Sequence, residues 1–159
     1  MHSRVFELSH KPIAAGERMT VAALPEWFML SACDYAVPSE QRDRDIDWLT
    51  DCFHGLCSRD GDKLTFAPDV KERYFRKNYE TFKKAAAELA KTDYDVFAGM
   101  RECTAFHIAR FDVDESYEGR YGFYVYSPES RELQPLDAWL RGADTGKPFY
   151  VGGTVDYHC

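Results

Sequence analysis

Acidic residues that recur at helical spacing are the side chains of this chain whose arrangement most suggests a function. They are Glu40, Asp43, Asp47 and Asp51. The pattern predicts a helix over 39–54, with the acidic stripe opposite an apolar stripe of Ile46, Leu49 and Phe53. At ~1.5 Å rise per residue, four-residue steps separate carboxylates by about 6 Å, which is close to the phosphate spacing along a nucleic-acid strand. The row therefore predicts a surface that imitates a nucleic acid.

An ordinary solvated helix face explains the same residues, and this alternative stays open. Like charges one turn apart cost a helix about 0.2 to 0.5 kcal/mol per pair. Glu40 and Asp43 fall near the predicted helix start, where the helix dipole favours anions. A second acidic group, expected on a loop, would extend the row if it lay on the same side. It consists of Asp112, Asp114, Glu115 and Glu118. Together these eight residues are the predicted partner-binding set.

The segment CFHGLC holds the tightest cluster of side chains that could bind a metal, namely Cys52, His54 and Cys57. A structural zinc site needs a further ligand pair at a recognisable spacing. The remaining candidates for that pair are Cys103 with His107 and His158 with Cys159. Neither pair has a zinc-site spacing, so we predict no metal and interpret Cys52 and Cys57 as small buried hydrophobic residues.

Other catalytic or cofactor motifs are not evident. No local signature supports a cysteine–histidine nucleophile pair. The pair Gly152-Gly153 lies inside a strand pattern with no helix after it, which predicts a β-bulge rather than a phosphate-binding loop. The aromatic run 123–126 is near acidic rather than basic residues, so it is interpreted as part of a half-buried sheet and not as a base-stacking platform. We predict no cofactor.

The elements that must position these residues indicate an α+β fold. They are a strand over 3–10, an extended run over 19–23, a helix over 25–30, the acidic helix capped by Pro38 and Ser39, a hairpin over 55–68, a long helix over 69–91, a short helix over 94–97, strands over 106–113 and 120–127 joined by an acidic loop at 114–119, a short helix around 136–140 and a strand over 148–158. We expect one domain over 1–159, with a mainly antiparallel sheet of about five strands packed against the long helix and the shorter helices.

The long helix has the clearest pattern, because apolar residues recur along it at alternating steps of four and three. This face contains Phe75, Tyr79, Phe82, Ala86 and Leu89. We expect it to be largely buried, so that Phe82→Ala would destabilise the fold by roughly 3 to 5 kcal/mol. The same segment carries a net charge of +3, against −7 for the whole chain, which favours orientation of a protein partner or head-to-tail self-association.

Bulk properties narrow the function classes. A net charge of −7 argues against sequence-independent binding to nucleic acid or to anionic membranes. Five cysteines without regular spacing favour reduced thiols over a disulfide framework. The N-terminal residues lack a signal-peptide pattern and no stretch is long and apolar enough to span a membrane, so we expect a cytoplasmic protein.

Two functional hypotheses follow. In size and charge the chain resembles small acidic α+β proteins of phages and mobile elements, although this resemblance covers no motif and assigns no residue. It implies a non-enzymatic module that binds a basic protein partner and occupies that partner's nucleic-acid site, as antirestriction and anti-CRISPR proteins do. Homo-oligomerisation is compatible with this hypothesis. The alternative is a small enzyme or ligand-binding domain with a site between the sheet and the long helix.

Overall fold

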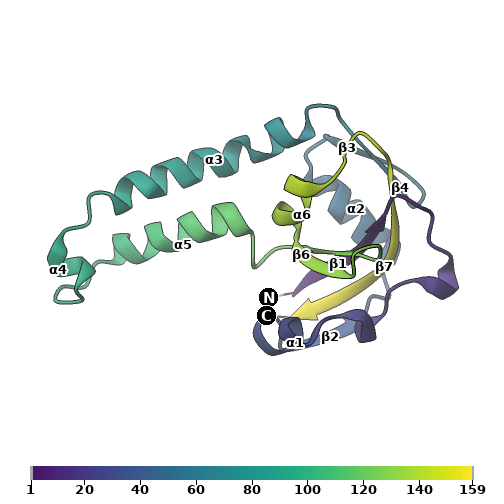
Figure 1. The fold of residues 1–159 in the computed structure, drawn as a ribbon, viewed down its shortest axis with the longest axis horizontal. Helices are drawn as coiled ribbons and strands as arrows, with labels where there is room; N and C mark the ends of the chain where they lie inside the picture. The colour runs from purple at the N-terminus through teal and green to yellow at the C-terminus, as the bar shows by residue number, and fades with distance from the viewer. Residues whose placement is uncertain (1, 159) are drawn as a thin grey trace.

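The protein consists of a body built around a sheet and a helical arm that projects from it (Figure 1). The computed structural model describes residues 2–158. The helices of the body are α1 (Glu26–Ser31), α2 (Arg42–Cys52) and α6 (Leu136–Gly142), and those of the arm are α3 (Val70–Leu89), α4 (Tyr94–Phe97) and α5 (Thr104–Glu118). The predicted α+β class is confirmed.

The sheet is mainly antiparallel, as predicted, although one parallel pair makes it mixed, and within residues 2–158 it has seven strands instead of about five. Its seven strands are β1 (His2–Ser9), β2 (Tyr35–Pro38), β3 (Cys57–Asp60), β4 (Lys63–Phe66), β5 (Tyr124–Ser127), β6 (Glu132–Pro135) and β7 (Phe149–His158). They follow the order β3-β4-β7-β1-β5-β6, and β2 pairs with the C-terminal part of β7. The β1–β5 pair is parallel and all the other pairs are antiparallel. The short strands β2 and β6 have no sequence pattern that predicted them.

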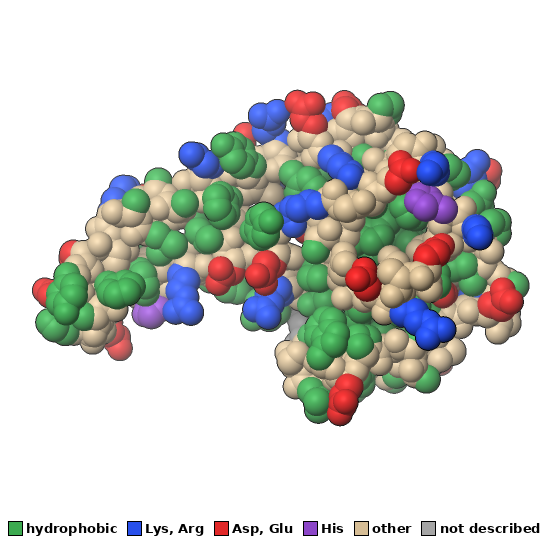
Figure 2. Space-filling view, viewed as in Figure 1, with side chains coloured by type: hydrophobic (Ala, Val, Ile, Leu, Met, Phe, Trp, Pro, Cys, Tyr) green, Lys and Arg blue, Asp and Glu red, His purple; other side chains and the backbone are tan. Residues whose placement is uncertain are grey.

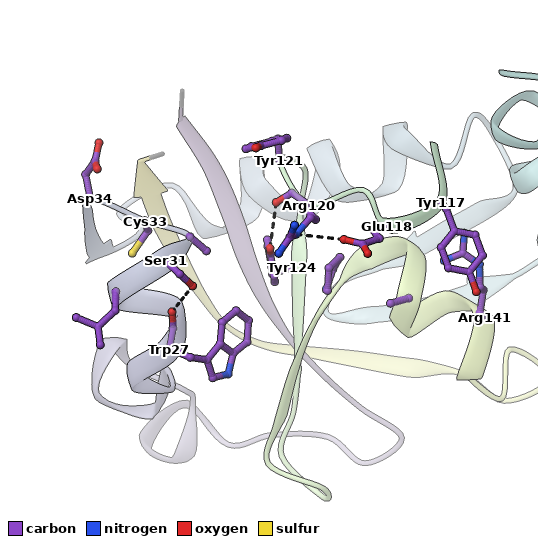
Figure 3. A pocket seen from close by; sticks show the side chains of 14 residues that line it. Trp27, Ser31, Cys33, Asp34, Tyr117, Glu118, Arg120, Tyr121, Tyr124 and Arg141 are labelled. Carbon is purple, nitrogen blue, oxygen red and sulfur yellow. Dashed lines mark hydrogen bonds and ion pairs between the residues drawn. The ribbon is translucent and has the colours of Figure 1, made fainter. Parts of the chain in front are cut away.

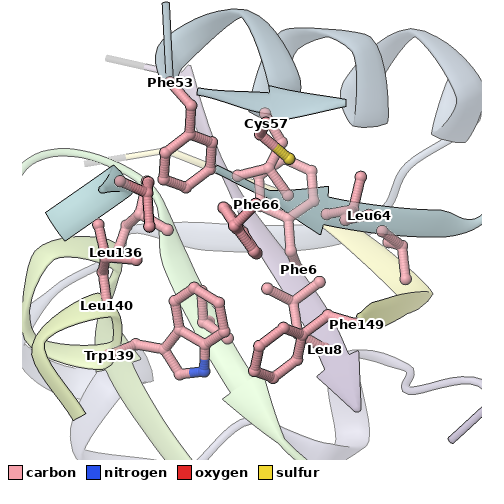
Figure 4. Close-up of a cluster of buried hydrophobic side chains, with 14 of the residues drawn as sticks. Phe6, Leu8, Phe53, Cys57, Leu64, Phe66, Leu136, Trp139, Leu140 and Phe149 are labelled. Carbon is pink, nitrogen blue, oxygen red and sulfur yellow. The ribbon is translucent and has the colours of Figure 1, made fainter. Parts of the chain in front are cut away.

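Hydrophobic side chains fill both faces of this sheet. On one face, α2, α6 and the β3–β4 hairpin cover a cluster that includes the fully buried Phe6, Phe53 and Leu140 (Figure 4). On the other face, α1 brings the fully buried Phe28 against Val5 and its neighbours. The body therefore has a core on each side of its sheet.

The predicted β-bulge at Gly152-Gly153 is confirmed. The register between β1 and β7 shifts between Phe6 and Leu8, so the two glycines lie opposite Glu7. The extra residue reverses the side-chain alternation of β7. Its first half consequently contributes to one core cluster and its second half to the other.

Close backbone packing explains why glycines occupy the bulge. The buried carboxylate of Glu7 accepts hydrogen bonds from the backbone N–H groups of Met19 (2.7 Å) and Gly153 (2.8 Å). A Cβ on Gly153 would lie 2.2 Å from the carbonyl oxygen of Met19, and one on Gly152 would lie 2.1 Å from Glu7 Oε2. A side chain at Gly153 would therefore clash with the Met19 backbone, and one at Gly152 would displace the Glu7 carboxylate.

The arm is a helical hairpin in which α3 and α5 pack side by side and α4 lies at the tip (Figure 1). Only the first turns of α3 reach the body, where Val70 belongs to the core and Tyr74 and Phe75 pack against it. The rest of α3 extends beyond the sheet instead of covering it. The prediction of a largely buried apolar face is therefore wrong for Tyr79, which is 58% exposed. Phe75, Phe82 and Leu89 are half-buried.

The predicted strand over 106–113 and loop over 114–119 are wrong, because these residues form α5. Aromatic and β-branched residues favour a strand. Their burial follows a helical period instead, since the side chains that are at least partly buried include Phe106, Ala109, Val113 and Ser116. The strand β6 takes the predicted place as the partner of β5.

Smaller corrections concern the N-terminal third. The run over 19–23, predicted as extended, contains the 3-10 helix Val21–Ala23. The acidic helix begins at Arg42 with Gln41 as its N-cap, so Ser39 does not cap it and instead accepts a hydrogen bond from the Gln41 N–H (3.2 Å).

The other predicted elements are confirmed within a few residues. They are the first and last strands, the short helices near 25–30, 94–97 and 136–140, the long helix and the 55–68 hairpin, which turns at Gly61 with φ +59°. Within residues 2–158, none of the helices has the length and hydropathy needed to cross a membrane.

Candidate protein interface

The acidic residues predicted on one helix remain exposed, but they do not form a continuous row. Asp43, Asp47 and Asp51 lie on the solvent side of α2, whose opposite side is buried in the body core. Glu40 is exposed as well, but it precedes the first helical residue by two positions. The stripe therefore extends over three carboxylates of the helix, with a fourth on the chain that leads into it.

Arg59, from the β3–β4 hairpin, forms ion pairs with two carboxylates of this stripe. The guanidinium of Arg59 donates to Asp43 Oδ1 (2.7 Å) and to Asp47 Oδ1 (2.5 Å). It thereby compensates the two central charges, although their side chains remain 84% and 66% exposed. Of the four acidic residues, Glu40 and Asp51 are the two that form no ion pair with any residue in 2–158. No local sequence pattern indicates this contact, because Arg59 lies on a different element.

The second acidic group lies in the arm rather than on a loop next to α2. Asp112, Asp114, Glu115 and Glu118 all belong to α5 (Figure 1). Asp112 and Glu115 face inward and line a cavity of about 280 Å³ between α3, α5 and the start of α6. Asp114 and Glu118 are exposed, and Glu118 pairs with Arg120 (3.1 Å). The structure thus divides the eight predicted residues between two separate regions, α2 with the chain that leads into it and α5.

Buried polar groups occupy the junction between the arm and the body. The carboxylate of Asp137, at the start of α6, accepts hydrogen bonds from the Tyr74 hydroxyl (2.8 Å) and the Asn78 amide (2.8 Å). Burial raises the pKa of Asp137. Burial also raises the pKa of Glu115, which lines the same cavity. These bonds attach the base of the arm to the body.

Exposed hydrophobic side chains are concentrated on the arm. Of the thirteen large hydrophobic residues that are exposed within 2–158, eight lie between residues 79 and 121. They are Tyr79, Tyr94, Phe97, Met100, Ile108, Phe111, Tyr117 and Tyr121. The tip has the most open of these, with Tyr94 at 75% and Phe97 at 77% exposure. Figure 2 shows hydrophobic side chains along the length of the arm and at its tip.

The arm buries little of its own hydrophobic surface. Beyond Val70, which belongs to the body core, the only buried residue of α3 is Ala85, and the only one of α5 is Ala109. Polar side chains such as Asn78 and Ser116 lie in the same seam. Helices of this length depend on tertiary packing for most of their stability. Exposed hydrophobic patches of this kind mark interaction sites.

Sequence reasoning missed this apolar surface, since it assigned α5 to strands and the apolar face of α3 to the core. A helical period in 104–118 would have been the available signal. The charge distribution is a second signal in the sequence. The α3 segment is net basic, while α5 holds four carboxylates against the single cation Arg110.

A larger cavity, of about 710 Å³, lies where the base of the arm faces α1 (Figure 3). Trp27 forms one wall, and the other includes Tyr117 with the Arg141 guanidinium 4.2 Å from the centre of its ring. The Ser31 and Tyr124 hydroxyls donate to the backbone carbonyls of Trp27 (2.6 Å) and Arg120 (3.0 Å). These hydroxyls therefore have structural partners rather than a neighbouring base.

The cysteines next to the acidic helix are poorly placed for nucleophilic chemistry. Burial raises the pKa of Cys52 to about 12 and that of Cys57 to about 12, so both thiols are protonated at neutral pH. Within residues 2–158, no three side chains of His, Cys, Asp or Glu are grouped so that they could hold a metal ion.

Comparisons with known proteins found no match to this chain, whether with family models, with curated proteins or with solved structures.

Proposed function

We propose that this protein is a non-enzymatic protein-binding module and that its arm is the binding element. The observation that carries the proposal is the concentration of exposed aromatic and aliphatic side chains on α3, α4 and α5. A protein interface is rich in aromatic residues and has an apolar centre with a polar rim. The arm has this composition, since charged residues flank the apolar ones on both helices.

The position of the arm supports the same proposal. It projects from the body, so both of its helices and its tip are accessible at once (Figure 1). The body is already packed on both faces of its sheet and does not need the outer arm for its cores. The exposed arm residues are therefore free to serve binding without a conflict with folding.

The experiment is affinity capture from a cell lysate with the full chain as bait. The arm variant carries Tyr79→Ser, Tyr94→Ser and Phe97→Ser, three exposed positions. The matched control is Leu30→Ser, because Leu30 is 77% exposed but lies on α1 of the body. Wild type and control are expected to retain the same partner and the arm variant to lose it. Equal capture by all three would contradict the proposal.

A second candidate uses the acidic surface of α2, on which Glu40 and Asp51 are exposed and without ion pairs among residues 2–158. In this proposal the module binds a basic protein and blocks its nucleic-acid site, as an antirestriction or anti-CRISPR inhibitor would. Binding would weaken steeply with salt, because exposed charges are screened within ~10 Å at 0.1 M salt. Glu40→Gln with Asp51→Asn would weaken the same binding, and salt-independent capture would rule this candidate out.

A further inference from the structure

We propose that two copies of this protein associate through their arms, with α3 of one copy against α5 of the other. The inference rests on the proposed function, because it names the protein that the arm binds: a second copy of this chain. It is carried by three features of the arm, which are the charges of its helices, the apolar face between them and the tip.

The two helices of the arm carry opposite net charges that do not pair with each other among residues 2–158. On α3, six basic residues outnumber Glu72, Glu80 and Glu88, while α5 has Arg110 against four carboxylates. Among residues 2–158, no ion pair joins α3 to α5, since Arg73 and Arg76 pair one turn back with Asp69 and Glu72. Opposite charges that stay unpaired in one copy can pair across an interface between two copies.

The apolar face of the arm lies between these charges. We define it by Phe75, Tyr79, Phe82 and Tyr117. The guanidinium of Arg141 lies over both the Phe75 ring (4.6 Å) and the Tyr117 ring (4.2 Å), so α3 and α5 present these residues on the same side. Tyr79 follows Phe75 by one turn, and residues one turn apart share a helix face. This face is exposed or half-buried throughout.

Each edge of the apolar face has a charged residue whose substitution can test whether two arms associate. Lys83 follows Tyr79 by four residues on α3, and Asp114 precedes Tyr117 by three residues on α5. Both are exposed, and neither forms an ion pair among residues 2–158. With α3 of one copy against α5 of the other, Lys83 of each copy lies on the same side of the pair as Asp114 of the other. The two residues are about 8 Å apart along the arm, a distance over which opposite charges still attract.

The tip distinguishes this arrangement from its alternative. Two arms can pack face to face about a two-fold axis in two ways. The α3 helix of one copy lies against α5 of the other only if both arms point in the same direction. The tips then meet, and each covers Tyr94, Phe97 and Met100 of the other. Arms in opposite directions would place one basic α3 against the other, which like-charge repulsion disfavours.

The area of the arm is sufficient for such a pair. With 20 residues, α3 is about 30 Å long, and two helices side by side are about 20 Å wide. The flat footprint is therefore roughly 600 Å² per copy, and the tip adds to it. A standard stable interface buries about 800 Å² per partner, so the arm reaches the required range.

The experiment is size-exclusion chromatography with light scattering over a range of protein concentrations. Wild type is expected at twice the monomer mass of 18.4 kDa. Lys83→Glu and Asp114→Lys are each expected to weaken association by roughly tenfold or more, because each places like charges at two symmetric contacts. Mixing these two variants should restore the dimer, since both contacts then pair opposite charges. Leu30→Ser, on the body, should leave association unchanged, and circular dichroism checks that every variant is folded.

The outcomes separate the inference from the proposed function. A wild type that remains monomeric, or a mixture of Lys83→Glu and Asp114→Lys that does not associate, overturns the dimer. If the chain is monomeric and the arm variant still loses a captured partner, the arm binds another protein and the proposed function stands. If the arm variant changes neither self-association nor capture, both proposals fail.

Discussion

The body and the arm differ in how much of their hydrophobic side-chain surface is buried. In the body, α1, α2 and α6 cover both faces of the sheet, so aromatic residues such as Phe28 and Phe53 are fully buried. In the arm, two helices meet along a narrow seam, and residues of the same kind remain exposed. Two helices alone cannot enclose a core, because each buries only the stripe that faces the other. This difference supports the proposal that the arm binds a partner.

The largest expected effect comes from matched truncations in the two regions. Phe53→Ala removes a fully buried ring from the body core and should lower the free energy of unfolding by about 3 to 5 kcal/mol. Phe82→Ala in the arm removes a half-buried ring, so the loss in the monomer should be about 1 to 2 kcal/mol. Urea unfolding of both variants at low protein concentration measures the difference. Equal losses would show that the arm is as tightly packed as the body.

A glycine pair tests how tightly the backbone of the body is constrained. Gly153→Ala would place a Cβ 2.2 Å from the Met19 carbonyl oxygen, so we expect a loss of about 1 to 3 kcal/mol from the strain. Gly16→Ala is the matched control, because a Cβ there meets no atom within 4 Å. Thermal unfolding of the two variants provides the measurement. A tolerated Gly153→Ala would mean that the β1–β7 bulge is looser than described.

The junction of body and arm should make stability dependent on pH. Burial raises the pKa of Asp137, so the folded state retains a proton that the unfolded chain releases near the ordinary pKa of 3.8. The stability contribution of this carboxyl therefore falls as the pH rises above that value and through the folded pKa. Asp137→Asn cannot titrate and should lack this part of the dependence. Unfolding curves of the two proteins that stay parallel from acid to neutral pH would contradict the assignment.

The smallest effect is expected on the acidic face of α2. Replacement of Asp43, Asp47 and Asp51 by Asn removes like-charge repulsion along the helix, but it also removes both ion pairs of Arg59. Exposed ion pairs contribute about 0 to 1 kcal/mol to stability. The free energy of unfolding should therefore fall by no more than this amount. A clear gain in stability, measured by urea unfolding, would show that repulsion outweighs the contacts of Arg59.

Local patterns in the sequence predicted most of the body and the positions of most helices. The hairpin turn at Gly61 and the bulge at Gly152-Gly153 follow from the conformations that glycine allows. The alternating four- and three-residue steps correctly predicted α3 as a helix. Periodicity identifies an apolar face but does not determine whether other elements bury it. The sequence pattern therefore predicted a buried Tyr79 that the structure leaves exposed.

The remaining features depend on contacts between distant segments. Arg59 reaches Asp43 and Asp47 because the β3–β4 hairpin folds back on α2, and no local pattern encodes that approach. Aromatic and β-branched residues of α5 favour a strand locally, and its packing against α3 follows a helical period instead. The sequence therefore indicated the charged residues of the candidate site, but it did not indicate the helical arm on which some of them lie.

Hydrogen exchange at different protein concentrations tests most directly whether the arm requires a partner. Amides of β1 and β7 should be strongly protected at every concentration, because both strands lie inside the sheet of the body. Amides of α3 and α5 should exchange faster in dilute samples and become protected as the concentration rises and arms associate. Strong protection of α3 and α5 at the lowest concentration, equal to that of β1, would show that the arm is complete by itself and would contradict the account.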